Sequence, residues 1–290
     1  MIFGWIQRQR EDQPCDWPVS VMCRVLKVSR SGYYAWLKRE PSKRQEQQMK
    51  WIEQINEAHR ASRHTYGSPR VTVELKHQGV QICENTVAKL MRRASLAAKV
   101  KRRFVPQTTD SAHGCPIAPN RLDRDFTAPM PNRRWTCDIT YISTDEGWLY
   151  LAVVMDLFSR RIVGWSMRPH LQAQLACEAL SMALHARRPD AGLLHHSDRG
   201  VQYACAAYRQ LLLDAQVEPS MSRAGNCYDN AVTESFFGTL KTELVNHEHY
   251  ATQEQARQSI FEWIEVFHNR QRRHSSLGYL SPEAFEAKLN

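Results

Sequence analysis

The sequence lacks several features that define common classes of protein. It has no run of about 18 apolar residues, so we expect no transmembrane helix. Its first residues carry no long apolar segment with a small-residue cleavage site, so we expect a cytoplasmic rather than a secreted protein. The eight cysteines include no CxxC pair and no Cys/His cluster at zinc-finger spacing. We therefore expect free thiols rather than disulfides or a zinc site.

Several catalytic and assembly motifs are also missing. The sequence contains neither a glycine-rich phosphate loop nor a GxSxG motif. Nucleotide hydrolysis and serine-esterase chemistry therefore have no support. No heptad repeat of the coiled-coil type is present either.

Positive charge is concentrated in the first half of the 290 residues. Residues 1–130 hold 23 Lys and Arg against 12 Asp and Glu, giving +11, whereas the remainder holds 16 against 18, giving −2. A basic segment before a nearly neutral, acid-bearing one indicates a DNA-binding arm followed by a catalytic domain. A solvated basic surface without a DNA partner is the alternative interpretation.

The basic half divides into three segments. Residues 1–40 contain two short apolar sets separated by a turn, which predicts an N-terminal helix–turn–helix. Residues 41–98 predict an amphipathic helix followed by a second helix–turn–helix. Residues 99–130 are rich in proline and have no periodicity, so we interpret them as a basic linker.

The second helix–turn–helix has recognisable start and stop signals. Ser68 and Pro69 predict the start of its first helix, Gly79 predicts a left-handed end, and Asn85 is expected to cap the second helix. Such a helix fits a major groove, although small helical bundles share the pattern. The basic residues expected to contact DNA are Arg70, Lys89, Arg92 and Arg93, with Lys101, Arg102 and Arg103 of the linker.

The sequence pattern of the acid-bearing half predicts a mixed α/β domain. Val, Ile, Tyr and Trp are enriched in its first three strands, which are joined by tight turns and should form an antiparallel meander. The expected elements are strands 135–143, 148–157 and 161–167, helix 172–187, strand 193–197, helix 202–215, strand 217–221 and a helix from about 230. This order predicts a five-stranded mixed sheet flanked by helices over residues 131–245, followed by a C-terminal helical segment, 246–290.

Three carboxylates in this domain have the character of metal ligands. Asp138 lies in the first strand, Asp198 follows the fourth, and Glu234 lies in the first turns of the last helix, at separations of 60 and 36 residues. Three acids on three elements can converge on one point, and Mg²⁺ prefers such hard oxygen ligands. Lys241 lies seven residues after Glu234, on the same helix face, where its ammonium could hold a phosphate.

Each of these residues also has an ordinary structural interpretation. Asp138 could be a solvent-facing strand residue, and Glu234 with Lys241 could be a charged helix face. His195 and His196 more often belong to a core strand than to a catalytic site. Other acids suit structural positions: Asp145, Glu146 and Asp156 in turns, Asp190 and Asp214 at helix ends or in loops, and Asp229 as a helix N-cap.

The residues around the three acids carry a family resemblance. The segments WTCDITYI, HHSDRGVQYA and NAVTESFFGTLKTEL resemble the integrase core of the retrovirus-like transposases of bacterial insertion sequences. The insertion-sequence-three family is similar in YGSPRVTVELKHQGVQICENTVAKLMRR, VMCRVLKVSRSGYYAWLKR and the closing NRQRRHSSLGYLSPEAF. The resemblance covers almost the whole chain.

The resemblance implies an RNase H-like core that cleaves DNA at element ends and transfers the strand to a target. It places Asp138, Asp198 and Glu234 on the catalytic acids, with two Mg²⁺ ions that Mn²⁺ can replace, and Lys241 on DNA. The implied partners are the terminal inverted repeats, target DNA, and the first-frame product OrfA, fused by frameshift in some cases. Pairing two DNA ends implies a dimer or larger assembly on bacterial DNA.

Two other functions are also compatible with the sequence. One is a DNA-binding repressor that occupies element ends with an inactive core. The other is a nuclease of the RNase H type, which would cut without joining. The intact acids argue against the first, and the two helix–turn–helix segments argue against the second.

Overall fold

The computed structural model describes residues 2–11, 17–99, 116–223 and 227–289. These form two compact units, Met1–Asn56 and Glu57–Asn290, and the boundary falls within helix α4 (Lys43–Ala61).

The first unit is a small helical domain. Its helices are α1 (Ile2–Glu11), α2 (Val19–Val25), α3 (Arg30–Leu37) and most of α4. Ile6, Met22 and Tyr33 are buried together at its centre. Ser29 begins α3 by accepting a hydrogen bond from the backbone N–H of Gly32 at 3.2 Å. The predicted helix pair is confirmed, whereas α1 has no counterpart in the prediction.

After the last residues of α4, the second unit continues with the second predicted helix pair, α5 (Ser68–His77) and α6 (Glu84–Arg93), which pack against each other. Gly79 ends α5 with φ +82°, a conformation that glycine adopts without steric cost. The N-cap of α6 is Cys83, so the prediction that Asn85 caps this helix is wrong. The N-cap of α5 is Gly67, one residue before the predicted Ser68.

The centre of the second unit is a five-stranded sheet in the order β3-β2-β1-β4-β5. The strands are β1 (Arg134–Thr144), β2 (Gly147–Asp156), β3 (Ile162–Arg168), β4 (Leu194–Ser197) and β5 (Glu218–Met221). β1, β2 and β3 form the antiparallel meander, and β4 and β5 extend the sheet in parallel with β1. The predicted mixed five-stranded sheet is confirmed.

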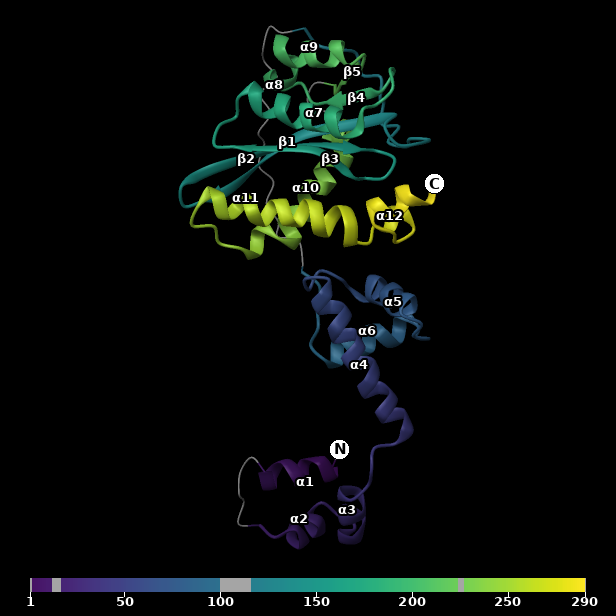
Figure 1. The fold of residues 1–290 in the computed structure, drawn as a ribbon. Helices are drawn as coiled ribbons and strands as arrows, with labels where there is room; N and C mark the ends of the chain where they lie inside the picture. The colour runs from purple at the N-terminus through teal and green to yellow at the C-terminus, as the bar shows by residue number, and fades with distance from the viewer. Residues whose placement is uncertain (1, 12–16, 100–115, 224–226, 290) are drawn as a thin grey trace. The chain divides into compact units, whose positions relative to one another are not determined.

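Helices cover both faces of this sheet (Figure 1). One layer holds α7 (Ala173–Arg187), α8 (Val201–Ala204) and α9 (Ala206–Asp214). The other holds α10 (Ala231–Glu243) and α11 (Gln253–Glu262). Alternate residues of β1 face opposite layers. Trp135 and Cys137 lie in the core with α7 and α9, so Thr136 and Asp138 face the layer of α10.

Two local features shape the α7 layer. A Cβ atom on Gly164 of β3 would lie only 2.2 Å from the carbonyl oxygen of Ala179 in α7, so glycine is needed for this close packing. The predicted helix 202–215 is interrupted at Cys205, whose backbone is extended and whose sulfur accepts from the N–H of Tyr208 at 3.4 Å. The single long helix predicted there is therefore wrong.

The C-terminal segment completes the second unit. It comprises α11, a π-helix Trp263–Gln271 that continues α11, and α12 (Pro282–Glu286). Short 3₁₀ helices within it cover Ser275–Leu277 and Ala287–Leu289. Two more flank α10, at Cys227–Asn230 and Val245–His247. Asn269 of the π-helix bonds both the N–H and the carbonyl of Ile162 at 3.0 Å. This side chain supplies hydrogen-bond partners to the backbone of the first residue of β3, which is an edge strand of the sheet.

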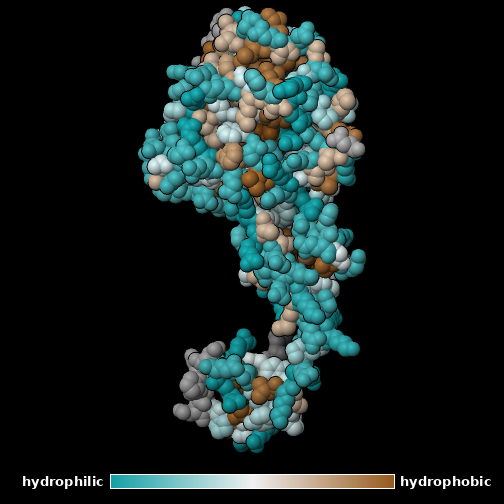
Figure 2. All heavy atoms as spheres, viewed as in Figure 1, coloured by the Kyte–Doolittle hydropathy of each residue, from teal (hydrophilic) through white to brown (hydrophobic). Residues whose placement is uncertain are grey.

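No helix within the described residues combines the length and the apolar character needed to cross a membrane. The face of the protein seen in Figure 2 is mostly hydrophilic, with hydrophobic residues in small groups.

Candidate active site

The register of the sheet brings Asp138 and Asp198 together. Thr136 on β1 pairs with His196 on the parallel strand β4. Continuing this register by two residues places Asp198, just after β4, opposite Asp138. Neighbouring strands lie about 4.8 Å apart, so the two carboxylates become neighbours although 60 residues separate them.

Backbone N–H groups orient both carboxylates. Asp138 accepts from the N–H of Ile139, and Asp198 accepts from the N–H of Gly200, each at 2.8 Å. A Cβ atom on Gly200 would lie 3.0 Å from the Asp198 carboxylate and 2.8 Å from the Gln202 side chain. Glycine at this position therefore allows the turn to close around Asp198.

The electrostatic environment of Asp138 disfavours its charged form. Desolvation, and after it the nearby charge of Asp198, raise the pKa of Asp138 well above its usual value, and Glu234 acts in the same direction. The ammonium of Lys241 opposes this shift in the pKa of Asp138. The carboxylate of Asp198 is thus close enough to that of Asp138 to disfavour its ionisation.

Glu234 and Lys241 approach this pair from helix α10. Glu234 lies in the first turn and is exposed, and partial desolvation raises its pKa. Lys241 lies in the last turn, with Nζ 4.8 Å from the ring centre of Tyr141 on β1. Desolvation lowers the pKa of Lys241, while Asp138 acts to raise it. Both side chains influence Asp138, as their spacing on one helix face leads us to expect.

The donor set fits a divalent cation, but it does not form a closed metal cage. Across the described ranges, no three Asp, Glu, His or Cys side chains are grouped so that they could hold a metal ion. The structure thus brings Asp138 and Asp198 together, but the carboxylate of Glu234 is not close enough to bind the same ion as these two. Carboxylate oxygens are the ligands that Mg²⁺ prefers, and a cation would offset the repulsion that raises the pKa of Asp138.

The two histidines before Asp198 are core residues. His195 accepts or donates a hydrogen bond with the hydroxyl of Tyr208 at 3.1 Å, and His196 bonds the hydroxyls of Ser220 and Ser222 at 2.9 and 3.0 Å. Desolvation lowers the pKa of His195 to about 3 and that of His196 to about 4. Both are neutral at physiological pH, which agrees with the structural interpretation.

Asp229 has a different role from the predicted N-cap. It is fully buried, and Arg223 bonds it through Nη2 at 2.8 Å and through its backbone N–H at 2.9 Å, while Arg124 bonds it at 3.1 Å. These bonds, with those of Arg223 foremost, hold the pKa of Asp229 below its usual value. The N-cap of α10 is the next residue, Asn230, so the prediction for Asp229 is wrong.

Asp156 occupies the predicted turn but is also fully buried. It accepts from the backbone N–H groups of Asn132 at 2.7 Å and Phe158 at 2.8 Å. Arg187 lies 3.6 Å from its carboxylate. Asp156 therefore closes the turn after β2 and joins it to α7.

The candidate DNA-contacting residues fall into three groups. Lys89, Arg92 and Arg93 are exposed on α6, whose Val87, Leu90 and Met91 are buried. Arg70 is different, because its guanidinium lies 3.6 Å from the carboxylate of Glu243 and its side chain is only 24% exposed. Lys101, Arg102 and Arg103 lie outside the described residues.

Glu243 is the centre of a buried ion cluster that sequence reasoning missed. Arg272 donates to both of its carboxylate oxygens, at 2.7 and 2.8 Å, and both side chains are less than 10% exposed. Lys99 donates to its carbonyl at 2.7 Å. The cluster joins α10, the C-terminal segment and, through Arg70, helix α5. The sequence offers no local signal for it, because its members are far apart along the chain.

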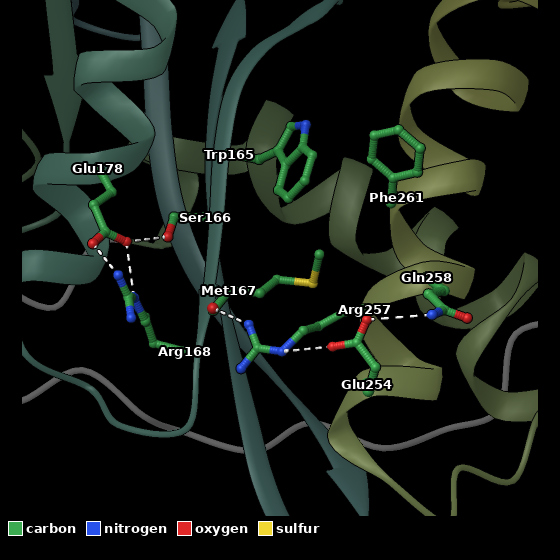
Figure 3. A pocket seen from close by; sticks show the side chains of 9 residues that line it. All are labelled: Trp165, Ser166, Met167, Arg168, Glu178, Glu254, Arg257, Gln258 and Phe261. Carbon is green, nitrogen blue, oxygen red and sulfur yellow. Dashed lines mark hydrogen bonds and ion pairs between the residues drawn. The ribbon is translucent and has the colours of Figure 1, made fainter.

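An open pocket elsewhere on the second unit has no part in this site. It measures about 530 Å³ and lies between β3, α7 and α11 (Figure 3). Its charged groups satisfy one another, since Arg168 pairs with Glu178 and Arg257 pairs with Glu254. None of the three candidate acids lines it.

The fold and the family matches together define the class of protein. A three-stranded antiparallel meander is extended by two parallel strands, with Asp138 on β1 and Asp198 just after β4. Residues 128–227 and 215–282 match families described as integrase core domain, and residues 45–104 match a helix–turn–helix-like domain.

The particular family follows from sequence relatives. The chain is 47% identical over 280 residues to the transposase InsF for insertion sequence IS3A of Escherichia coli (strain K12), covering 96% of this chain and 97% of that protein. It is 46% identical over 269 residues to a 31 kDa protein of insertion element IS600 of Shigella sonnei, covering 93% and 98%. The chain therefore belongs to the IS3 family of insertion-sequence transposases.

Solved structures show weaker likenesses. The catalytic domain of Mos1 mariner transposase has a TM-score of 0.40 and 16% identity, covering 47% of this chain and 71% of that one. The catalytic core of HTLV-2 integrase in complex with magnesium has a TM-score of 0.39 and 15% identity, covering 51% and 92%.

Proposed function

We propose that this transposase cleaves DNA at the ends of its element and joins them to target DNA, with Asp138, Asp198 and Glu234 holding two Mg²⁺ ions. The observation that supports this most is the placement of Asp138 opposite Asp198, where each raises the energy of the other's charge. Mn²⁺ has similar ligand preferences and should substitute for Mg²⁺.

The reaction consists of two phosphoryl transfers. Water attacks the phosphorus at the element end, the P–O bond to the 3′ oxygen breaks, and a 3′-hydroxyl is released. That hydroxyl attacks a target phosphodiester, so one P–O bond forms as another breaks and the target's own 3′-hydroxyl leaves. When bound, two Mg²⁺ ions would stabilise the charge on phosphate as Lewis acids and would lower the pKa of the attacking group.

The residues of the chain position these reactants. Asp138 and Asp198 are held by backbone N–H bonds on neighbouring strands, so their spacing is set by the sheet. Glu234 is not grouped with this pair within the described residues, so we propose that it completes the ligand set from α10 when the ions bind. Lys241, partly desolvated beside Tyr141, neutralises a phosphate of the DNA near the same centre.

DNA binding outside the core is assigned to the second helix–turn–helix. Helix α6 presents Lys89, Arg92 and Arg93 to solvent on the face opposite its buried residues. Charged residues on one side of a recognition helix reach phosphates beside the major groove. Lys101, Arg102 and Arg103 are proposed to continue this contact along the backbone, while Arg70 contacts DNA only if it leaves Glu243.

Replacing Lys89, Arg92 and Arg93 together by Gln is expected to weaken binding of duplex DNA on the order of 100-fold at about 0.15 M salt. Each phosphate contact contributes about 0.9 to the slope of log affinity against log salt, so the slope should fall by about 2.7. Binding isotherms at several salt concentrations measure both quantities.

A matched control removes the same charge from other exposed positions. Arg121, Arg209 and Arg270 are exposed and lie outside α6. If their replacement by Gln weakens binding as much as the α6 triple does, only net charge matters and the assignment of α6 is refuted.

The proposed function is tested with a labelled duplex that carries the terminal inverted repeat of the element. With Mg²⁺ we expect a nick that exposes a 3′-hydroxyl, then a joined product with a second duplex, and neither in the presence of EDTA. Binding without cleavage would indicate the repressor, and cleavage without joining would indicate the nuclease. Either result contradicts the proposal.

Two partners complete the proposal. Pairing two element ends requires at least two copies of the chain on DNA, and the first-frame product OrfA is expected to supply the assembly element that this sequence lacks. Sedimentation of the protein with end duplexes, with and without OrfA, measures the stoichiometry. A single copy on two paired ends would contradict this part.

A further inference from the structure

We propose that Asn230 is a positioning residue that ties the helix carrying Glu234 to the strand carrying Asp138. The inference rests on the proposed function of these two acids. It assigns a task to a buried polar cluster, Thr136, Asn230 and Thr233, that the sequence did not reveal.

The contacts of Asn230 run between elements. Its side-chain amide donates to the carbonyl of Cys137 on β1 at 3.2 Å. Its side-chain oxygen accepts from the hydroxyls of Thr136 on β1 at 2.6 Å and Thr233 on α10 at 3.0 Å. The two threonine hydroxyls also lie 3.0 Å apart. One amide thus uses both ends to join the strand to the helix.

Burial makes these bonds consequential. Asn230 is 5% exposed, Thr136 is 1% exposed and Thr233 is fully buried. Without their partners, these buried polar atoms would be left without hydrogen bonds, which is unfavourable because water cannot reach them. The cluster therefore favours one relative position of β1 and α10.

The cluster lies next to both proposed metal ligands along the chain. Thr136 and Cys137 directly precede Asp138, and Asn230 is the N-cap of α10, four residues before Glu234. N-cap side chains ordinarily accept from N–H groups of their own helix, but Asn230 makes no such bond. Its side chain serves the contact with β1 instead.

The neighbouring residue anchors the helix start on its other side. Asp229 is held by Arg223 and Arg124, and Asn120 donates to it at 3.0 Å. Consecutive residues therefore fix the beginning of α10 to two separate parts of the unit. Of these two residues, Asn230 is the one that bonds β1. The position of Glu234 relative to Asp138 therefore depends on Asn230.

Asn230→Ser tests this role. Serine caps helices about as well as asparagine, carries no charge and is too short to keep the bond to Cys137. We expect the Kd for Mn²⁺, measured from the paramagnetic resonance of the free ion, to rise about 10–100-fold, as when residues that orient metal ligands are lost. The Mn²⁺ concentration for half-maximal cleavage should rise by the same factor.

Asn269→Ser is the matched control. Asn269 is also buried and bridges backbone groups, but it does so at Ile162 on β3, away from the acids. The Asn269→Ser substitution should lower thermal stability about as much as Asn230→Ser does, and it should leave Mn²⁺ binding unchanged. Thr136→Val removes only the hydroxyl that donates to Asn230. It should raise the Kd for Mn²⁺ by a smaller factor than Asn230→Ser does. This variant provides the test if Asn230→Ser fails to fold.

The outcomes separate the two proposals. Wild-type affinity for Mn²⁺ in both Asn230→Ser and Thr136→Val would overturn the positioning role. An equal loss in Asn269→Ser would overturn it too, since any loss of stability would then suffice. If the wild-type protein itself binds no Mn²⁺, the proposed metal site is wrong and the role of Asn230 falls with it.

Discussion

Replacing Asp138 by Asn is expected to lower the rates of DNA cleavage and joining by about 1,000-fold or more. The amide keeps the size of the side chain but removes an anionic ligand beside Asp198, and with it several kcal/mol of charge stabilisation. DNA binding should persist, because the proposed DNA contacts of α6 do not depend on this residue. Single-turnover cleavage of a labelled end duplex and a parallel binding isotherm measure the two effects.

Asp190→Asn provides the control for this substitution. Asp190 is 87% exposed and makes only a loose ion pair with Arg133 at 3.8 Å. It should cleave and join like the wild type. Retained joining by the Asp138 variant would show that Asp138 is not a required metal ligand. A joint loss of DNA binding would show that the substitution acts through binding rather than through the chemical step.

Replacing Glu243 by Gln is expected to lower the free energy of unfolding by about 3–5 kcal/mol. The neutral amide cannot compensate the charge of Arg272, which is only 5% exposed, and it turns an N–H₂ group toward a guanidinium donor. The change also weakens the attachment of Arg70 and thus of α5. Thermal unfolding should show a midpoint about 10 °C lower.

Glu218→Gln is the matched control, because Glu218 pairs with Arg121 at the same 2.7 Å but both side chains are more than half exposed. An exposed pair contributes about 0–1 kcal/mol, so this variant should unfold close to the wild type. Equal midpoints for the two variants would mean that the Glu243 cluster adds no net stability.

The elements of the core could be predicted because local pattern determines them. The apolar runs that became β1 and β2 and the alanine-rich α7 fall within one or two residues of their predicted bounds. Gly79 ended its helix for the reason inferred from its conformational freedom. The three acids could be identified because they lie on three separate elements that can converge and because the segments around them carry the family resemblance.

The rest depends on contacts between distant residues. Asn230 and Thr136 are 94 residues apart, and Glu243 and Arg272 are 29 apart, so no local pattern links them. Asp229 was expected to cap a helix because aspartate commonly does so. Arg124, 105 residues away, and Arg223, six residues away, bind it instead, and the N-cap of α10 is the next residue, Asn230. The distance of Glu234 from the other acids is likewise a tertiary property.

Crystals of the protein soaked in Mn²⁺ test the central claim most directly, through anomalous scattering from the ion. We predict two peaks about 3.5–4 Å apart, each at a ligating distance of about 2 Å from oxygens of Asp138, Asp198 or Glu234. Peaks elsewhere, or none at these carboxylates, would contradict the proposed metal-dependent site.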